Sequence, residues 1–531
     1  MEILSLKLMG NSGVNSDVAP FELPPEFLSS GVNFKALNGS LSPAGGSRKT
    51  RDTPGGSAYG FVKHISAKGS DFWVIASRYA VWMTEGGTAP WVDISSRVYG
   101  VPDGGQYDWV GSQLGQILVM NNPSLHPEYL LPSGDKLEVL PFSPTETWQD
   151  RNLSCRTMRV HKNFLMAMNL TGTEDEPNGF RFSHPAAENG IPYTWDTTDR
   201  SSIAVKGQLG SDGGQIVDGL TLRDTFVMYS QNSIDNFSFN PSSEFYWSRK
   251  ELSSTVGLLA QRCLTEVKGT HFLIVDGDIV TNNGSAIASI MYKRLLKRFN
   301  ARTNEYTAFN SYVARNDIDK EVWFCVPEDD SVTASTAYVY NWKDDSWAIR
   351  DLPENTAHIG YGRNPGEEST SAAITWESLK AAVGESINSW ASFKGVPWGR
   401  RIVGSRDDRL VGVDTSGNLS DVDPLGPIDG DTFNMSLERL DFPLLDHVGT
   451  VAITRVFPTA TGGPFIMQLG IQNFAGGPVT WGGEHTFDPG TDRYFDIRMT
   501  GELLCYRIKS INDIRFSFSG ARIQILPAGL R

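Results

Sequence analysis

Carboxylate clusters are the residues of this sequence that could carry out catalysis, because paired carboxylates can hydrolyse a glycosidic bond. Four such clusters occur, at Glu174–Glu176, Asp329–Asp330, Asp344–Asp345 and Asp407–Asp408. Asp is favoured in β-turns, where its side chain bonds the backbone, and the clusters favour that interpretation. The eight histidines are scattered, with no two at metal-ligand spacing. We therefore predict no catalytic, cofactor-binding or metal-binding residues.

Motifs with a defined mechanism are absent from the sequence. It contains no HExxH zinc motif, no P-loop, no GxSxG elbow and no dinucleotide fingerprint after a strand. The four cysteines are each at least 60 residues from the next, so no CxxC pair exists. Cys325 lies in the apolar run Val322–Val326, which predicts a buried thiol. We expect four free thiols in a protein made in a reducing cytosol.

Basic clusters offer a second chemistry, contact with phosphate groups. Two are short, Arg48–Arg51 and Arg400–Arg401, and the third lies within 285–302. In the third, basic residues at i, i+4 spacing share one side of a helix, and Met291, Leu295 and Phe299 form an apolar stripe. The pattern predicts a helix over 285–302. Its four cations are candidate phosphate contacts, with a solvated helix face as the alternative: Lys293, Arg294, Lys297 and Arg298.

Composition limits the class of protein. The 531 residues carry 47 Lys and Arg against 61 Asp and Glu, a net charge of −14, which excludes a basic nucleic-acid binder by bulk charge. Aromatic residues are 11 % and charged residues 20 %, which excludes a disordered chain. No 18-residue apolar run exists, which excludes a membrane-spanning helix. The length allows about three or four domains, or fewer large ones.

Short strands that alternate with turns must position these groups. Ten runs rich in Val, Ile, Phe, Trp or Tyr are bounded by Gly, Asn, Asp or Pro, a pattern that predicts an all-β chain. They are Asp71–Ser77, Tyr79–Met83, Trp91–Ile94, Gln116–Met120, Asn163–Met168, Thr225–Tyr229, His271–Val275, Glu321–Val326, Ala337–Asn341 and Arg409–Val413.

A repeat of tryptophans accompanies the strands. Trp91, Trp148, Trp195, Trp247, Trp347 and Trp398 are spaced by 57, 47, 52, 100 and 51 residues. With one missing station near position 297 the mean is about 51, close to the length of a four-stranded propeller blade. We predict a divergent β-propeller of roughly six to eight blades, because the WD and kelch signatures are absent. Chance spacing of core tryptophans is the alternative.

Composition shifts divide the chain into three parts. Residues 1–60 are rich in Gly and Pro and poor in strands, and predict an extended N-terminal arm, with a disordered terminus as the alternative. Residues 61–429 would form the propeller-like domain, with inserts near 285–302 and 370–393, the second weakly helical. Residues 430–531 predict a C-terminal antiparallel β-sandwich of about 100 residues. Its strands are expected at 451–456, 465–471, 493–497, 503–508 and 514–518, with a last one at Ile523 and Ile525.

A set of local strings, in order along roughly residues 10–400, resembles tail proteins of short-tailed bacteriophages. Their order carries the resemblance, since no single string is diagnostic. The strings are Gly13–Asp17, Leu23–Pro24, Phe180–Pro185, Pro192–Asp196, Gly214–Asp224, Phe226–Tyr229, Ser233–Ile234, Ala337–Asn341, Trp347–Pro353 and the Trp376-Glu-Ser-Leu379 echo. The family is the tail nozzle protein, also called tail tubular protein B or packaged-DNA stabilisation protein.

The resemblance implies a virion structural protein without catalytic residues. It implies a homohexameric ring in the virion tail, assembled in the host cytoplasm below the portal and adaptor proteins and close to tail fibre or needle proteins. Such a ring retains packaged double-stranded DNA and conducts it during ejection, without sequence-specific binding and without a membrane anchor. Two alternatives are a receptor-binding or fibre-anchoring tail protein and a propeller glycosidase that acts on cell-surface glycan.

The charge distribution sharpens the expectation for a DNA path. Residues 430–531 carry a net charge of −1, and residues 1–429 carry −13. We therefore expect a DNA path that is acidic or neutral and built mostly by residues 1–429, because basic lining would bind phosphates and slow sliding. The segment Lys293–Arg298 is the first place where a basic lining would contradict this expectation.

Overall fold

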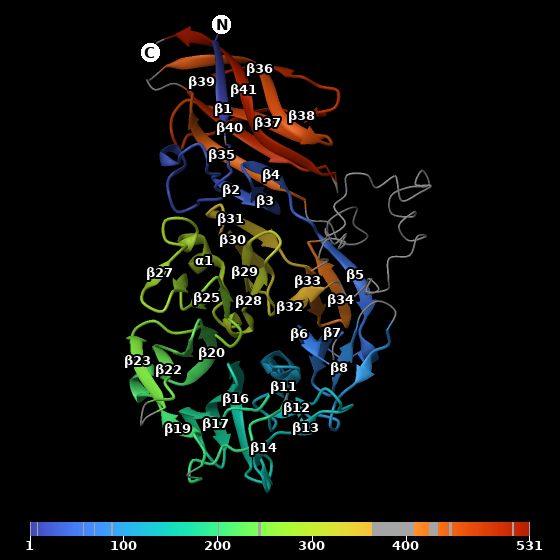
Figure 1. Cartoon of the computed structure of the whole chain (residues 1–531). Coiled ribbons are helices and arrows are strands. Elements are labelled where there is room, and N and C mark those ends of the chain that lie inside the picture. Colours follow the sequence, from blue (N-terminus) through green and yellow to red (C-terminus); the bar gives the residue numbers. More distant parts are fainter. Residues whose placement is uncertain are drawn as a thin grey trace, which may run out of the picture.

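Figure 1 shows the computed structural model of the chain, which is mostly β-strand. The structure describes the chain apart from residues 364–407 and 424–433 and short stretches at 1, 8, 57, 68–69, 86–88, 189, 200, 243–245, 445–448, 512–513 and 530–531. The predicted insert at 370–393, Trp398 and the Arg400–Arg401 pair lie outside the described residues.

Four-stranded antiparallel sheets make up the larger part of the molecule, and the described residues form seven of them. The first four sheets are β6 (Tyr59–Ala67), β7 (Ser70–Ser77), β8 (Val81–Thr84), β9 (Val92–Asp93); β10 (Val110–Leu114), β11 (Ile117–Asn121), β12 (Glu128–Leu130), β13 (Glu138–Val139); β16 (Leu153–His161), β17 (Phe164–Gly172), β18 (Glu176–Phe182), β19 (Val205–Gln208); and β20 (Ile216–Leu222), β21 (Thr225–Ser230), β22 (Ile234–Phe239), β23 (Trp247–Ser253). The last three are β24 (Leu264–Val267), β25 (Thr270–Val275), β26 (Asp278–Asn282), β27 (Ile287–Ser289); β28 (Tyr312–Asn316), β29 (Glu321–Val326), β30 (Thr336–Asn341), β31 (Ser346–Asp351); and β32 (Thr356–Arg363), β33 (Asp408–Asp414), β34 (Asn418–Val422) with β5 (Ser47–Asp52). A short hairpin of β14 (Pro141–Ser143) and β15 (Glu146–Thr147) lies between the second and third sheets.

The seven sheets follow one another around a ring, which makes the arrangement propeller-like (Figure 1). The first strand of each sheet contacts the first strand of the next, and β32 of the last sheet returns to β6 of the first. The seventh sheet takes its outer strand, β5, from the N-terminal side of the chain, where Ser47 pairs with Val422. The ring is therefore closed by backbone pairing between residues far apart in the sequence.

Two further antiparallel sheets form the C-terminal end, and both chain termini lie there (Figure 1). One sheet holds β1 (Glu2–Lys7), β3 (Phe34–Leu37), β4 (Ser40–Pro43), β36 (Thr450–Gly462), β39 (Phe495–Gly501) and β41 (Phe516–Gly529). The other holds β2 (Ser30–Val32), β35 (Ser436–Pro443), β37 (Phe465–Gln472), β38 (Thr480–Phe487) and β40 (Leu503–Lys509). Phe465 of β37 stacks on Phe516 of β41 at 4.6 Å, so aromatic packing joins the two sheets.

The expectation of a strand-poor arm at residues 1–60 is wrong. This segment supplies β1 to β5, and β1 pairs along its length with β41, from Glu2 opposite Ile525 to Lys7 opposite Gly520. The strands β4 and β5 are short and mostly polar, so their pattern is weak in the sequence, and the partners of β1, β2 and β5 lie some hundreds of residues away.

The predicted helix over 285–302 is only partly confirmed. The helix α1 spans Leu296–Arg302, and residues 287–289 form β27 instead. Lys293 takes a left-handed backbone conformation with φ of 58°, which no helix tolerates in its interior. The apolar stripe is confirmed, because Met291, Leu295 and Phe299 are all buried.

The strand predictions are largely confirmed, because these runs are apolar on both faces. β29 occupies the predicted Glu321–Val326 and is buried at every position, as is β11. In the C-terminal part, the two strands expected at 514–518 and at Ile523–Ile525 form the single strand β41. Trp148, Trp195 and Trp347 are fully buried, and first strands begin 43 to 63 residues apart.

Candidate functional site

The four candidate phosphate contacts lie where the N-terminal segment meets the ring. The guanidinium of Arg294 pairs with Asp345 at 3.0 Å and lies 4.6 Å from the ring centre of Phe27. The backbone carbonyl oxygen of Arg294 accepts hydrogen bonds from the amides of Ser16 and Asp17. Lys293 lies beside the ring of Tyr292.

Asp17 caps α1 from outside the helix. Its carboxylate accepts hydrogen bonds of 3.0 Å from the backbone amides of Leu296 and Lys297, 279 and 280 residues later. The Lys297 ammonium in turn donates to the carbonyl oxygen of Asp17 at 2.8 Å. Leu295, at the cap position itself, contributes no side-chain bond. The helix is thus held by a residue that only the tertiary fold brings near.

The fourth cation, Arg298, pairs with the buried carboxylate of Glu328 at 3.5 Å. It also lines a cavity of about 150 Å³ between the N-terminal segment, β2 and β31. Near this cavity Gly13, with φ of 80°, lies so close to β31 that a Cβ would meet the Trp347 carbonyl oxygen at 1.9 Å. Arg294 and Lys297 are therefore engaged in contacts that fasten the N-terminal segment to the ring, whereas Arg298 is paired within the ring.

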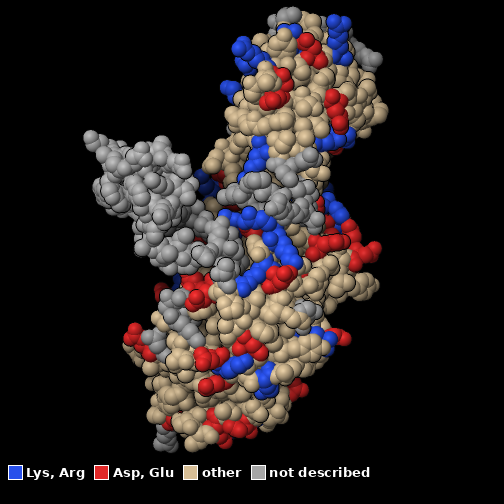
Figure 2. Space-filling view, turned by 90° about the vertical axis from the view of Figure 1, so that its right-hand side faces the viewer, with Lys and Arg blue, Asp and Glu red and all other residues tan. Residues whose placement is uncertain are grey.

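The Arg48–Arg51 cluster lies on β5, the strand that closes the ring. Arg48 reaches the buried carboxylate of Asp421 at 3.5 Å, and Lys49 pairs with Asp52 at 2.5 Å. The guanidinium of Arg51 lies 5.2 Å from the ring centre of Trp91. Figure 2 shows this side of the molecule, where Lys and Arg side chains gather at mid-height among acidic ones.

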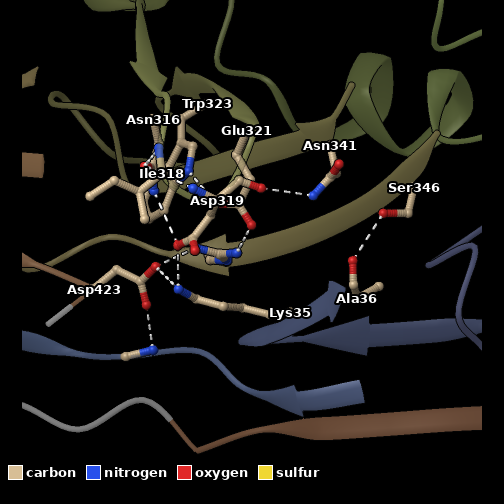
Figure 3. A network of polar contacts seen from close by, with 12 residues as sticks. Lys35, Ala36, Asn316, Ile318, Asp319, Glu321, Trp323, Asn341, Ser346 and Asp423 are labelled. Carbon is tan, nitrogen blue, oxygen red and sulfur yellow. Dashed lines mark hydrogen bonds and ion pairs between the residues drawn. The ribbon is translucent and has the colours of Figure 1, made fainter. Parts of the chain in front are cut away.

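A buried ion cluster joins the ring to the C-terminal sheets (Figure 3). Lys35 of β3 donates to Asp319 at 2.7 Å and lies 2.5 Å from Asp423. Arg350 of β31 bonds Glu321 at 2.6 Å and Asp423 at 3.0 Å. We call these five residues the joint cluster: Lys35, Asp319, Glu321, Arg350 and Asp423.

Four separate parts of the chain bring the joint cluster together, with Lys35 in β3 and Arg350 in β31. Asp319 and Glu321 lie at the β28–β29 turn of the sixth sheet, and Asp423 directly follows β34 of the seventh. The remaining oxygens of Glu321 and Asp423 are also bonded: the Trp323 indole donates to Glu321 at 2.9 Å, and the Gly45 amide donates to Asp423 at 2.6 Å. Buried charges that are paired and hydrogen-bonded hold a joint in one geometry.

Burial and neighbouring charges shift the pKa values of the joint cluster. Burial opposes the charge on Lys35, but Asp423 and the other carboxylates outweigh it and raise its pKa above 10.5. Burial likewise opposes the charge on Asp319, and Lys35 outweighs it, so that the pKa of Asp319 is lowered. For Glu321 burial dominates and raises the pKa, despite Arg350. The cluster holds three carboxylates and two cations. A raised Glu321 pKa favours its protonated form, in which two carboxylates remain against two cations.

Three carboxylates of the joint cluster lie close enough together to be considered as metal ligands. Asp319, Glu321 and Asp423 have ligand atoms within 4.8 Å of one another, the one such group found in the described part of the chain. Lys35 and Arg350 already pair with these carboxylates, so the group acts as an ion-pair network. Sequence reasoning missed it, although a lysine inside the apolar run Phe34–Leu37 was a usable signal.

The carboxylate clusters considered for glycoside hydrolysis lie in turns and ion pairs. Asp329 and Asp345 have left-handed backbones, with φ of 53° and 48°, which confirms the turn interpretation for both. Asp329 pairs with Arg302, and Glu174 and Glu176 both pair with Lys206. Asp407 lies outside the described residues. All four cysteines are buried, as predicted for Cys325.

Comparisons with known proteins do not identify the chain. No family model matches it, and no curated protein matches it. Among solved structures, a chain from "Crystal Structure of Mitotic Checkpoint Complex" matches with 9% identity and a TM-score of 0.37, over 71% of this chain and 94% of that chain. A match this distant carries no argument about function. In the described residues, no helix has the length and apolar character needed to span a membrane.

Proposed function

We propose that this protein is a structural subunit of a short-tailed phage tail nozzle, a ring below the portal and adaptor that retains packaged DNA and conducts it during ejection. The observation that carries the proposal is the way in which the N-terminal strands join the ring to the C-terminal sheets. Residues 1–52 supply strands to both C-terminal sheets and to the ring, and the joint cluster fixes the junction between them. A wall around DNA under pressure needs such a rigid junction and needs no catalytic site.

We infer further that the seven four-stranded sheets are propeller blades and that the two C-terminal sheets form a β-sandwich. The unbroken series of contacts between first strands supports the first inference. The stacking of Phe465 on Phe516 between the two C-terminal sheets supports the second. Closure by β5 suits a propeller, because it removes the open edge that an unclosed ring of sheets would leave.

The DNA path in this proposal runs between copies of the chain. Arg262, which precedes β24, donates from Nη1 to the Gly60 carbonyl oxygen in β6 at 3.0 Å, so a side chain crosses the ring within one subunit. A duplex needs a passage far wider than a filled ring of seven sheets. A head-to-tail interface that closes after six copies supplies such a passage. The net charge of −14 per chain keeps the wall from binding phosphates.

The test is the position and stoichiometry of this chain in a virion or tail map. We expect a closed six-fold ring below the adaptor, and particles that lack the protein should lose their DNA. Images of intact tails without such a ring would overturn the proposal. Purified protein that adsorbs to host cells and blocks infection would favour a receptor-binding or fibre-anchoring protein instead. Release of sugar from surface glycan would favour a glycosidase.

A further inference from the structure

One guanidinium spans the middle of the sheet ring. Arg262 belongs to the segment before the fifth sheet, and Gly60, which accepts its hydrogen bond, belongs to the first sheet. Around the ring these two sheets are separated by two sheets in one direction and by three in the other. The side chain therefore crosses the axis, and Arg262 is only 8% exposed.

Positive charge exceeds negative charge around this axis. Arg159 of β16 forms a two-pronged pair with Asp218 of β20, with distances of 2.8 and 2.5 Å. The backbone amide of Arg262 donates to the same Asp218 carboxylate at 3.1 Å. The ammonium of Lys63 in β6 donates to a neutral group, the carbonyl oxygen of Gly111. Lys63 and Arg159 thus share Asp218, and the carboxylate whose charge acts on the Arg262 guanidinium is Asp108.

The titration of neighbouring groups agrees with this crowding. Burial lowers the pKa of His358 well below 6.5, and the charges of Arg262, Lys63 and Arg159 lower it further. Burial and Arg159 lower the pKa of Lys63 to about 8. Arg156 also interacts with Asp108, so the four cations Lys63, Arg156, Arg159 and Arg262 face two carboxylates, Asp108 and Asp218.

Part of the Arg262 guanidinium has no partner in the described part of the chain. Its Nε is buried and makes no hydrogen bond, and the same is true of the Nε of Arg156. A buried N–H group without a partner costs free energy, and the cost is larger when the group is charged. Arg262 also has a left-handed backbone with φ of 68°, a conformation that costs free energy in a residue other than glycine. These costs are offset if a ligand bonds the free groups.

We propose that the ring axis is a binding site for a small oxyanion of the phosphate class, held by Arg262, Lys63 and Arg156. The fork of an arginine matches two oxygens of such an anion, and a lysine adds a point charge. The carboxylates of Asp218 and Asp108 do not balance the nearby cations, and the anion supplies the missing negative charge. This site is distinct from the DNA path and does not rest on the proposed nozzle function.

Calorimetric titration of the full-length protein with inorganic phosphate tests the site, at pH 7 and constant ionic strength in a buffer free of other oxyanions. We expect saturable binding of one phosphate per chain. Arg262→Met and Lys63→Met should each weaken it at least tenfold, and Arg262→Lys should retain part of the affinity because it keeps the charge. Lys206→Met, which removes a surface ion pair with Glu174 and Glu176, is the matched control and should bind as wild type does.

Two outcomes would overturn the site: no saturable binding by the folded wild-type protein, or unchanged affinity in folded Arg262→Met. If Arg262→Met does not fold, the melting temperature of Lys63→Met decides. Phosphate should raise the melting temperature of wild type and of Lys206→Met in a concentration-dependent way, as ligand linkage requires. An equal rise in Lys63→Met would contradict the proposal.

Discussion

Four of the five charged side chains of the joint cluster are buried and Asp319 is half-buried, so each depends on the others for its charge. Lys35, Arg350 and Asp423 are almost fully buried, and every oxygen of Asp423 and Glu321 has a partner. Removing one member leaves the others charged and unpaired in a poorly polarisable interior, which costs more than the pair itself contributes.

Arg350→Met should therefore destabilise the protein strongly. We expect a loss of about 3–5 kcal/mol, because Glu321 and Asp423 lose their shared cation. Urea unfolding followed by intrinsic fluorescence measures the shift in midpoint. Arg455→Met, which breaks the exposed pair with Asp496, is the control and should shift the midpoint far less. Equal shifts in the two variants would show that the joint cluster contributes no more to stability than an exposed ion pair does.

The alkaline limit of stability should depend on Lys35. Its pKa in the folded protein lies above the ordinary 10.5, so its contribution is fully present below pH 10.5 and is lost as the pH rises through the folded value. Relative to its own stability at pH 8, Lys35→Met should lose less than wild type between pH 10 and 12. Parallel pH profiles for the two proteins would rule out a charged Lys35 in the folded state.

Strands and helices show where sequence reasoning succeeds and where it stops. β29 and β11 are predictable because each is a short apolar run, bounded by turn residues, whose length and composition suit a strand buried on both faces. β5 is not, because Ser-Arg-Lys-Thr-Arg-Asp becomes a strand only by pairing with β34, some 370 residues later. The helix at 285–302 is overestimated for a similar reason: Lys293 breaks it, and Asp17 caps its start.

Closure of the ring by β5 can be tested with an engineered disulfide. Ser47 and Val422 are register partners, so Ser47→Cys with Val422→Cys should crosslink under mild oxidation. After proteolytic cleavage between residues 53 and 417, the two ends should remain joined on a non-reducing gel. Ser47→Cys with Ser420→Cys is out of register and should not crosslink. Efficient crosslinking of the second pair alone would contradict the β5–β34 register.

Capping of α1 by Asp17 predicts a local effect. Asp17→Ala removes both acceptors for the Leu296 and Lys297 amides and should cost about 0.5–2 kcal/mol. Hydrogen exchange, read by mass spectrometry, should speed up in peptides that cover 294–302. Asp17→Asn keeps one oxygen acceptor and should have a smaller effect. Asp175→Ala, an exposed carboxylate, is the control, and the same exchange in all variants would exclude the cap.

For the whole molecule, the sequence indicated an all-β chain, an approximate repeat and a change near residue 430. It could not indicate that both ends of the chain build the C-terminal sheets, because that pairing joins residues such as Glu2 and Ile525. Nor could it reveal the joint cluster, whose members come from four separated segments. The charge total, by contrast, is a property of composition and needs no fold.

The four buried thiols give a test of global integrity. Burial raises the pKa of Cys263 to about 12 and that of Cys505 to about 11, and it raises the pKa of Cys155 and Cys325 further. A thiol-reactive dye at pH 8 should therefore label none of them in the native protein and all four in denaturant. Rapid labelling of the native protein would show that a core region opens readily.

The pairing of β1 with β41 has a consequence for synthesis on the ribosome. Glu2 is made before all seven sheets of the ring, and its partner Ile525 is made after them. At about 5–20 residues per second, the first strand waits roughly half a minute to two minutes for its neighbour. A nascent chain thus carries an unpaired β1 throughout the synthesis of the ring and until β41 is made. Stop codons that remove only the last strand should leave that edge exposed and send the product to chaperones or proteases instead of assembly.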